Sequence, residues 1–194
     1  MVYDWDNLAK HWEDNTTNTQ FVGQVFQQLK TLTSLDGKHV LDYGCGTGLL
    51  SQMMSPFVKS IVALDASESM IEELDQKELA NVEPVVDALT RGLVAQHPAF
   101  RKQFDLIVAA SVCGYVDDFE QVADIIYSLL DDGGVFIQWD WLAQSSLAEH
   151  QLDEIKVRNA LSQAGFSAIE VAQAFVIETE SGPQAAFFAI GRKL

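Results

Sequence analysis

The residues whose types and spacing point most directly to chemistry are the glycines of the stretch Asp42-Tyr43-Gly44-Cys45-Gly46-Thr47-Gly48. An apolar run precedes this stretch and two leucines follow it, which is the pattern of a buried strand that turns tightly into a helix. Glycine has no Cβ to hold a ligand away from the backbone, and the first N–H groups of a helix are unpaired. The stretch therefore predicts a turn against which a ligand lies, and a tight turn without a ligand is the alternative.

The spacing of the glycines indicates which ligand this turn would take. A dinucleotide-binding turn has the pattern Gly-x-Gly-x-x-Gly, so after Gly44 and Gly46 the third glycine would fall on Leu49. The third glycine is Gly48, one position early. The pattern therefore disfavours an NAD-dependent oxidoreductase and favours a nucleoside that carries an amino-acid tail.

An acidic residue follows the glycines at a separation typical of nucleotide-binding units. Asp65 ends the next apolar run and lies 21 positions after Gly44. At about this distance a strand–helix–strand unit places an acid on the ribose hydroxyls, and both hydroxyls can donate to one carboxylate. The alternative role for Asp65 is to cap the helix that begins near Ala66 and Ser67.

These features resemble the class I S-adenosylmethionine-dependent methyltransferases, whose first motif is an acidic residue followed by Gly-x-Gly-x-Gly. Asp42, Gly44, Gly46 and Gly48 match that motif position by position. The resemblance covers residues 36 to 192 and implies S-adenosylmethionine as the cofactor. The cofactor-binding residues that it predicts are Asp42, Gly44, Cys45, Gly46, Gly48, Asp65, Ala66, Met70, Asp87, Ala88 and Ser111.

The resemblance also implies roles for residues near the ends of the later strands. Asp87 would accept a hydrogen bond from the adenine N6 amine while the Ala88 backbone meets N1, although an Asp at this position is also an ordinary turn residue. Met70 would lie against the adenine or pack in the core. Ser111 follows the strand Phe104–Ala110 and would contact the methionine part of the cofactor.

Aromatic residues are the predicted lining of the acceptor side. Trp5 and Trp12 would fold over the pocket as a lid that excludes water, or would anchor the N-terminal segment to the body. Tyr115 and Trp141 follow strands that end at the same edge of the sheet as the glycine turn, so they would face an acceptor. The alternatives are a packed aromatic ring for Tyr115, and for Asp140 and Trp141 packing against the following helix.

Transfer from such a donor is an in-line displacement that needs no strong acid, and orientation alone can supply about 7–11 kcal/mol of the barrier. An acceptor that carries a proton needs a base, and His11, Tyr115 and Asp140 are the predicted candidates. No metal site is predicted. The alternatives to a methyltransferase are a module that binds S-adenosylmethionine without catalysis, and another transferase that uses the same donor.

The order of apolar runs predicts the fold class. Strand-like and helical segments alternate up to residue 165, and two strands, 168–179 and 184–192, form a hairpin at the end. We expect an α/β fold with a doubly wound, mostly parallel seven-stranded sheet, helices on both faces and a C-terminal antiparallel hairpin. Residues 1–35 are predicted to be an N-terminal arm and helix, a possible lid, and residues 36–194 the S-adenosylmethionine-binding methyltransferase domain, within one domain overall.

Several details of this fold are also predicted. Pro84 places the strand Val82–Val86 at a sheet edge, and His39 is expected to be exposed at the start of its strand. A helix over 118–130 ends at the turn 131–134, before a strand over 135–139. A helix over 148–164 presents Leu152, Ile155, Leu161 and Ala164 inward and His150 outward, and Gly165 caps it.

The composition limits the partners. A net charge of −16 argues against nucleic acid and against an anionic membrane surface, and it suits a neutral or cationic small-molecule acceptor. The chain opens without a basic and apolar leader, and its longest apolar run is too short to span a bilayer, so a cytoplasmic location is expected. Cys45 and Cys113 make neither a metal site nor a disulfide framework. The oligomeric state is not indicated.

Overall fold

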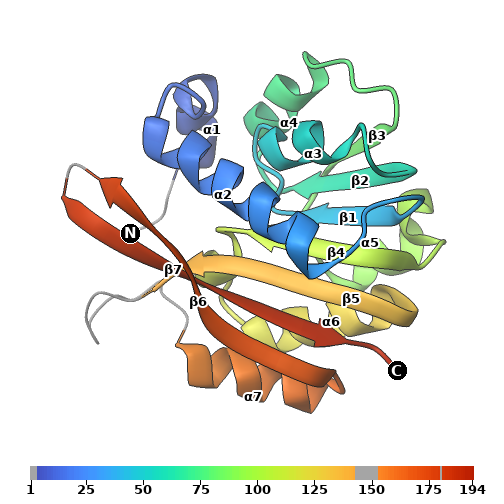
Figure 1. The fold of residues 1–194 in the computed structure, drawn as a ribbon. Coiled ribbons are helices and arrows are strands. Elements are labelled where there is room, and N and C mark those ends of the chain that lie inside the picture. Colours follow the sequence, from blue (N-terminus) through green and yellow to red (C-terminus); the bar gives the residue numbers. More distant parts are fainter. Residues whose placement is uncertain (1–3, 143–152, 180) are drawn as a thin grey trace.

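The computed structural model describes residues 4–142, 153–179 and 181–194, and its strands form one seven-stranded sheet in the order β3-β2-β1-β4-β5-β7-β6 (Figure 1). The strands are β1 His39–Tyr43, β2 Ser60–Asp65, β3 Val82–Val86, β4 Phe104–Ala110, β5 Leu130–Trp141, β6 Ser167–Thr179 and β7 Gly182–Arg192. The helices are α1 Trp5–Leu8, α2 Thr16–Leu32, α3 Leu49–Met54, α4 Glu68–Asp75, α5 Arg91–Gln96, α6 Phe119–Leu129 and α7 Glu154–Ala164. The predicted fold class is confirmed.

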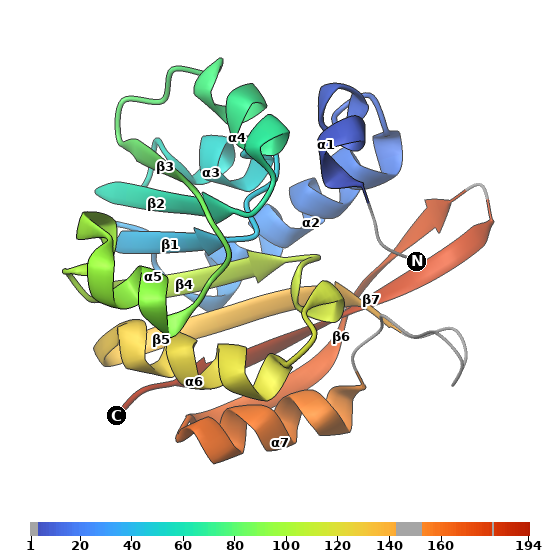
Figure 2. The ribbon, with the colours of Figure 1, turned by 180° about the vertical axis from the view of Figure 1, so that it is seen from behind.

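Helices cover both faces of the sheet, because the central strands are apolar on both sides. Val40 of β1 packs in a core with residues of α2, α3 and α4, whereas the next residue, Leu41, packs with residues of α5, α6 and α7. Figure 1 shows α2 and α3 in front of the sheet, and Figure 2 shows α5, α6 and α7 on the opposite face. Alternation along a strand therefore builds two separate cores, one in each layer of helices.

The strand order creates the crevice in which such sheets hold a ligand. β1 pairs in parallel with both β2 and β4. The chain therefore adds β2 and β3 on one side of β1 and then crosses over to add β4 and β5 on the other side. β7 then pairs antiparallel with β5 and β6, which closes the sheet with the hairpin that the sequence predicts. Because the carboxyl ends of β1, β2 and β4 meet at one edge, the loops after these strands come together at the switch point.

The edge position of β3 is confirmed, but the prediction for His39 is wrong. β1 lies between two strands, so even its first residue is covered, and His39 is 8% exposed. Its ring stacks on Phe104 with centroids 4.6 Å apart, and Nδ1 lies 2.8 Å from the Ser60 hydroxyl oxygen. Burial lowers the pKa of His39, so the ring acts as a neutral packing group in β1.

Two further details differ from the prediction. β5 begins at Leu130 directly after α6, so the turn expected at 131–134 is instead an irregular start of the strand, where the register with β4 shifts. In α7, Val157, Ala160 and Leu161 face the core, whereas Ile155, which was predicted to face inward, is 69% exposed. Ile155 lies two positions before Val157, which is about 200° around the helix, so the two side chains point to opposite sides. Gly165 caps α7 in the left-handed conformation as expected, and Leu152 and His150 lie outside the described residues.

No helix in the described ranges has both the length and the apolar character that crossing a membrane requires.

Candidate functional site

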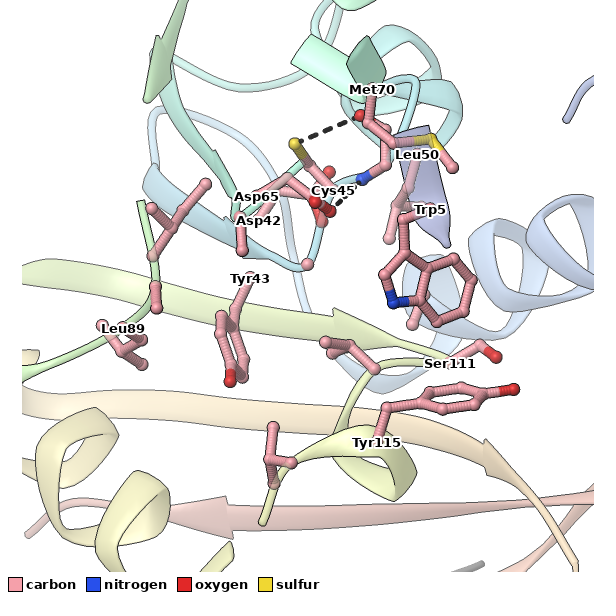
Figure 3. Close-up of a pocket in the computed structure, with 18 of the residues that line it drawn as sticks. Trp5, Asp42, Tyr43, Cys45, Leu50, Asp65, Met70, Leu89, Ser111 and Tyr115 are labelled. Atoms are coloured by element: carbon pink, nitrogen blue, oxygen red, sulfur yellow. Dashed lines mark hydrogen bonds between the residues drawn. The ribbon is translucent and has the colours of Figure 1, made fainter. Parts of the chain in front are cut away.

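A cavity of about 440 Å³ opens at the carboxyl ends of β1, β2 and β4. The glycine turn and Asp65 form one part of its wall, and Trp5, Ser111 and Tyr115 lie on the other side, as Figure 3 shows. The cavity is therefore at the switch point, where the strand order predicts a ligand.

The three glycines of the turn all have positive φ, but they serve different purposes. A Cβ on Gly44, at φ 68°, would overlap the side chain of Val112, and a Cβ on Gly48, at φ 78°, would overlap that of Leu74. A Cβ on Gly46, at φ 54°, would instead make ordinary van der Waals contacts, 3.8 Å from the Met70 sulfur and 4.0 Å from the Trp12 Nε1. Gly44 and Gly46 line the cavity, whereas Gly48, which was predicted to bind the cofactor, lies outside its wall and allows α3 to pack against α4.

Asp65 holds the turn in shape. Its Oδ2 accepts a hydrogen bond from the Gly46 N–H at 2.9 Å, and its Oδ1 accepts one from the Ser67 N–H at 2.9 Å. The side chain that caps α4 belongs to Ser67, whose hydroxyl accepts from the Met70 N–H. Burial raises the pKa of Asp65. Each carboxylate oxygen retains a second lone pair, so Asp65 can still accept from ligand hydroxyl groups in the cavity.

The acid that opens the motif joins the strand to the following helix. Asp42 is buried at the end of β1, and its Oδ2 accepts a hydrogen bond of 2.6 Å from the Ser51 hydroxyl of α3. Burial raises the pKa of Asp42 to about 6, against the lowering effect of the Ser51 bond. Asp42 thus fixes the direction in which α3 leaves the turn.

The predicted adenine side is brought together. Met70 is 2% exposed, so it packs in the interior and also lines the cavity, and Ala66 lines the cavity beside it. Asp87 and Ala88 line the cavity too, and the Asp87 Oδ1 accepts from the Ala88 N–H at 2.8 Å. An apolar slot with a carboxylate and backbone groups at one end results.

Aromatic rings form the wall opposite the glycine turn. Trp5, Trp12, Tyr115 and Trp141, the residues predicted to line the acceptor side, all line the cavity. Trp5 makes edge contacts with Trp12 at 5.8 Å and with Tyr115 at 5.1 Å between ring centroids. Ser111, at φ 58°, lines the cavity just before Tyr115. The N-terminal segment thus forms part of the cavity wall.

Two acids that the sequence analysis did not single out fasten this segment to the turns around the cavity. The Asp6 Oδ1 accepts from the Ser67 hydroxyl at 2.5 Å, and the Glu13 Oε1 accepts from the Thr47 hydroxyl at 2.7 Å. Lys77 of the loop after α4 also reaches Glu13, with its Nζ at 2.6 Å. The signal in the sequence is the placement of acids beside the tryptophans, but their partners lie far along the chain.

Of the three predicted bases, only Tyr115 lines the cavity. The His11 side chain is 82% exposed and pairs with Asp14 at 2.9 Å, outside the cavity wall. Asp140 is 3% exposed and lies behind the wall, where it accepts from the Gly114 N–H and the Gln138 side-chain amide, each at 3.2 Å. Burial raises the pKa of Asp140 to about 7. Asp140 therefore supports the turn that carries Tyr115.

The charged groups of the cavity wall are of one sign. Asp42, Asp65, Asp87, Asp117 and Asp118 line it, and none of the described lining residues is Lys, Arg or His. Cys45 also lines the cavity, and both Cys45 and the buried Cys113 are free thiols. A wall of this kind disfavours anions and tolerates cations.

The methyltransferase domain family matches residues 8–171, which is most of the chain, and the chain belongs to the class I S-adenosylmethionine-dependent methyltransferases. An uncharacterized methyltransferase of Schizosaccharomyces pombe is 25% identical over 173 residues, which are 85% of this chain and 57% of that protein. The ubiquinone biosynthesis O-methyltransferase of Pseudomonas entomophila is 32% identical over 136 residues, which are 67% of this chain and 57% of that protein. The chain thus spans little more than half the length of these curated relatives.

A solved structure supports the fold independently. The N-methyltransferase NodS from Bradyrhizobium japonicum, in complex with S-adenosyl-L-homocysteine, superposes with a TM-score of 0.72 and 18% sequence identity. The match covers 94% of this chain and 90% of that chain. At this identity the likeness concerns the fold, and it agrees with the sheet order described above.

Proposed function

We propose that this chain transfers a methyl group from S-adenosylmethionine to a small-molecule acceptor. The observation that carries the proposal is the glycine turn after β1, which Asp65 holds against a cavity whose other wall is aromatic. The family of the chain supports the same activity. The relative from Pseudomonas entomophila is named for ubiquinone biosynthesis, which supports a small-molecule acceptor. NodS was solved with S-adenosylhomocysteine, the demethylated form of the donor, which supports the donor.

The residues present fit the proposed donor. Gly46 offers a backbone without a side chain, so a bulky ligand can lie directly on the turn. We infer that the free lone pairs of Asp65 accept the ribose hydroxyls, and that the slot of Met70, Asp87 and Ala88 takes the adenine. The methionine end then extends toward Ser111 and the aromatic wall.

The donor supplies an electrophilic methyl group and its own leaving group. The work left to this chain is to orient the acceptor in line with that methyl group and to exclude water, which the ring contacts among Trp5, Trp12 and Tyr115 favour. We infer that the N-terminal segment acts as the lid. Tyr115, whose ring lines the cavity, is the remaining candidate base for the acceptor proton.

We also propose that the protein acts in the cytoplasm.

Binding of S-adenosylhomocysteine, measured by calorimetry, tests the donor site. We expect Asp65→Asn to weaken binding by about ten-fold or more, because a neutral amide loses the charge-assisted bonds to two hydroxyls. Asp36→Asn, which removes an exposed charge outside the cavity, is the matched control. Absence of any binding by the wild-type protein would refute the proposal.

A module that binds the donor without catalysis is the second candidate, because two of the three predicted bases lie outside the cavity wall. Transfer of a labelled methyl group to members of a metabolite panel separates the two functions. Binding of the donor with no transfer to any member favours the module, whereas a labelled product establishes the enzyme.

A further inference from the structure

The charges around the cavity separate into two groups. Asp42, Asp65 and Asp87 lie on the side assigned above to the donor. Asp117 and Asp118 follow Tyr115 and line the cavity at its exposed rim. Asp118 has a structural task, because its Oδ1 accepts from the Gln121 N–H at 2.9 Å and caps α6. Asp117 has no comparable bond within the described part of the chain, so its charge is available to a ligand.

The charge of the wall discriminates among acceptor classes. A carboxylate or phosphonate acceptor is bound in proteins by Arg or Lys, and the described lining contains neither. A hydroxyl acceptor is too weak an acid to give its proton to water or to a carboxylate, and of the three predicted bases only Tyr115 lines the cavity. An amine fits the wall better, because it arrives as a cation, can give its proton to a carboxylate or to water, and is a strong nucleophile once it is neutral.

The rings of the wall suit the same class. Trp5 contacts Trp12 and Tyr115 edge to face, so three aromatic rings in contact line the same cavity as the rim acids. Aromatic faces attract ammonium groups, with Trp the strongest, and the attraction grows when water is excluded. The net charge of −16 adds a long-range field that draws cations toward the molecule.

We propose that the acceptor is an amine, recognised as its ammonium form by Trp5, Trp12, Tyr115 and the rim carboxylate of Asp117, and methylated on nitrogen. The proposal rests on the proposed function and goes beyond it by naming the substrate class. It also separates this chain at the acceptor from the O-methyltransferase to which it is similar.

The reaction balances without a further reagent. The ammonium group releases one proton to the Asp117 carboxylate or to water at the rim, which frees the nitrogen lone pair. That pair forms the new bond to the methyl carbon while the bond between carbon and sulfur breaks, and its electrons stay on sulfur. The positive charge of the sulfonium therefore moves to the methylated nitrogen, and the proton held at the rim passes to solvent.

Binding of a matched pair of probes tests the recognition without knowledge of the natural acceptor. The probes are choline and its uncharged carbon isostere 3,3-dimethylbutan-1-ol, titrated into protein saturated with S-adenosylhomocysteine and followed by calorimetry. Saturation fills the donor side, so the probes report on the aromatic side alone. We expect choline to bind about ten-fold more tightly than the isostere.

Two variants and two controls locate the probe. Trp5→Leu and Asp117→Asn should each weaken choline binding about five- to ten-fold, with little effect on the isostere for Asp117→Asn. Phe57→Leu, an exposed ring elsewhere, and Glu120→Gln, an exposed acid on α6 outside the wall, should leave choline binding as in the wild type.

The outcomes distinguish this inference from the proposed function. If S-adenosylhomocysteine binds but choline does not saturate, or binds no better than its isostere, the amine proposal is overturned and the donor site stands. If S-adenosylhomocysteine itself does not bind, the proposed function fails and the amine proposal falls with it.

Discussion

At the scale of single residues, the glycines after β1 show how one motif combines structural and ligand-binding requirements. Gly48 allows close packing against Leu74, whereas Gly46 lines the cavity and a Cβ there would meet no atom closer than 3.8 Å. Both have positive φ, where an alanine costs about 1–2 kcal/mol. A side chain at position 48 would therefore also disturb the packing of α3 on α4, whereas one at position 46 would also disturb ligand binding.

We predict that Gly48→Ala lowers the free energy of unfolding by about 2–5 kcal/mol, because strain and overlap with Leu74 add, and that the folded fraction still binds S-adenosylhomocysteine. Gly46→Ala should cost about 1–2 kcal/mol in stability but weaken that binding about ten-fold. Urea denaturation and calorimetry measure the two effects. As the control, the double variant Gly48→Ala with Leu74→Ala should lose less stability than the sum of the losses in the two single variants, because the overlap between the two side chains is gone. Unchanged affinity in Gly46→Ala would contradict the assignment.

Asp140 provides a prediction in pH. Its pKa rises on burial from 3.8 to about 7, so its contribution to stability is fully present below about pH 4 and is lost as the pH rises toward 7. Asp140→Asn should therefore match the wild type near pH 4 and exceed its unfolding free energy at pH 8 by a few kcal/mol, since one pKa unit corresponds to about 1.4 kcal/mol. Denaturation at both pH values measures the difference.

A neighbour of Asp140 can form a hydrogen bond with an asparagine at this position. The Gln138 Oε1 is buried and has no hydrogen-bond partner among the described groups, so a rotated Gln138 amide can accept from the side-chain amide that the substitution introduces. Asp42, whose pKa rises to about 6, titrates in both proteins and cancels from the comparison. A variant that is less stable than the wild type at pH 8 would show that the carboxylate is charged and satisfied in the folded protein.

At the scale of elements, α1 and the turn after it form part of the cavity wall, and side chains of this segment bond to the loops around it. Glu13 accepts from Thr47 in the glycine turn and from Lys77 after α4. Glu13→Gln should speed amide exchange in residues 5–12 and accelerate release of S-adenosylhomocysteine by about three- to ten-fold. We expect only a modest change in global stability, because the substitution removes the charge of one partly exposed ion pair at the edge of the fold. Hydrogen exchange and stopped-flow fluorescence measure these effects.

Asp14→Asn is the matched control for this element. Asp14 lies next to Glu13, but its partner His11 belongs to the same segment, so the ties to the body remain. Exchange in residues 5–12 that rises equally in both variants would show that Glu13 does not hold the segment.

At the scale of the whole molecule, the net charge of −16 makes self-repulsion a measurable term. Raising the salt concentration from about 10 mM to about 150 mM shortens the screening length from about 30 Å to about 8 Å. We therefore predict that the melting temperature rises over this range in a calorimetric scan. A melting temperature that falls would mean that attractive ion pairs outweigh the repulsion.

Most of the fold follows from local patterns, because strands such as Ser60–Asp65 and Val82–Val86 are short, mostly apolar runs with polar residues at or next to their ends. Asp65 is likewise visible from its separation from Gly44, and Asp42 from the motif that resembles the methyltransferase family. The burial of His39, in contrast, depends on which strands lie on either side of β1. The partners of Asp6 and Glu13, which are Ser67 and Thr47, lie 61 and 34 positions away along the chain. Such pairings arise only when the sheet assembles, so no local window of sequence reveals them.

The ties of the N-terminal segment have one more consequence. Glu13 and Asp6 accept hydrogen bonds from Thr47 on the loop after β1 and from Ser67 on the loop after β2, and Asp65 bonds to both of these loops. A ligand that makes the two loops more rigid should therefore also hold the N-terminal segment in place over the cavity. Under the proposed function, S-adenosylhomocysteine leaves only after this segment moves away, and we expect product release, rather than methyl transfer, to limit turnover.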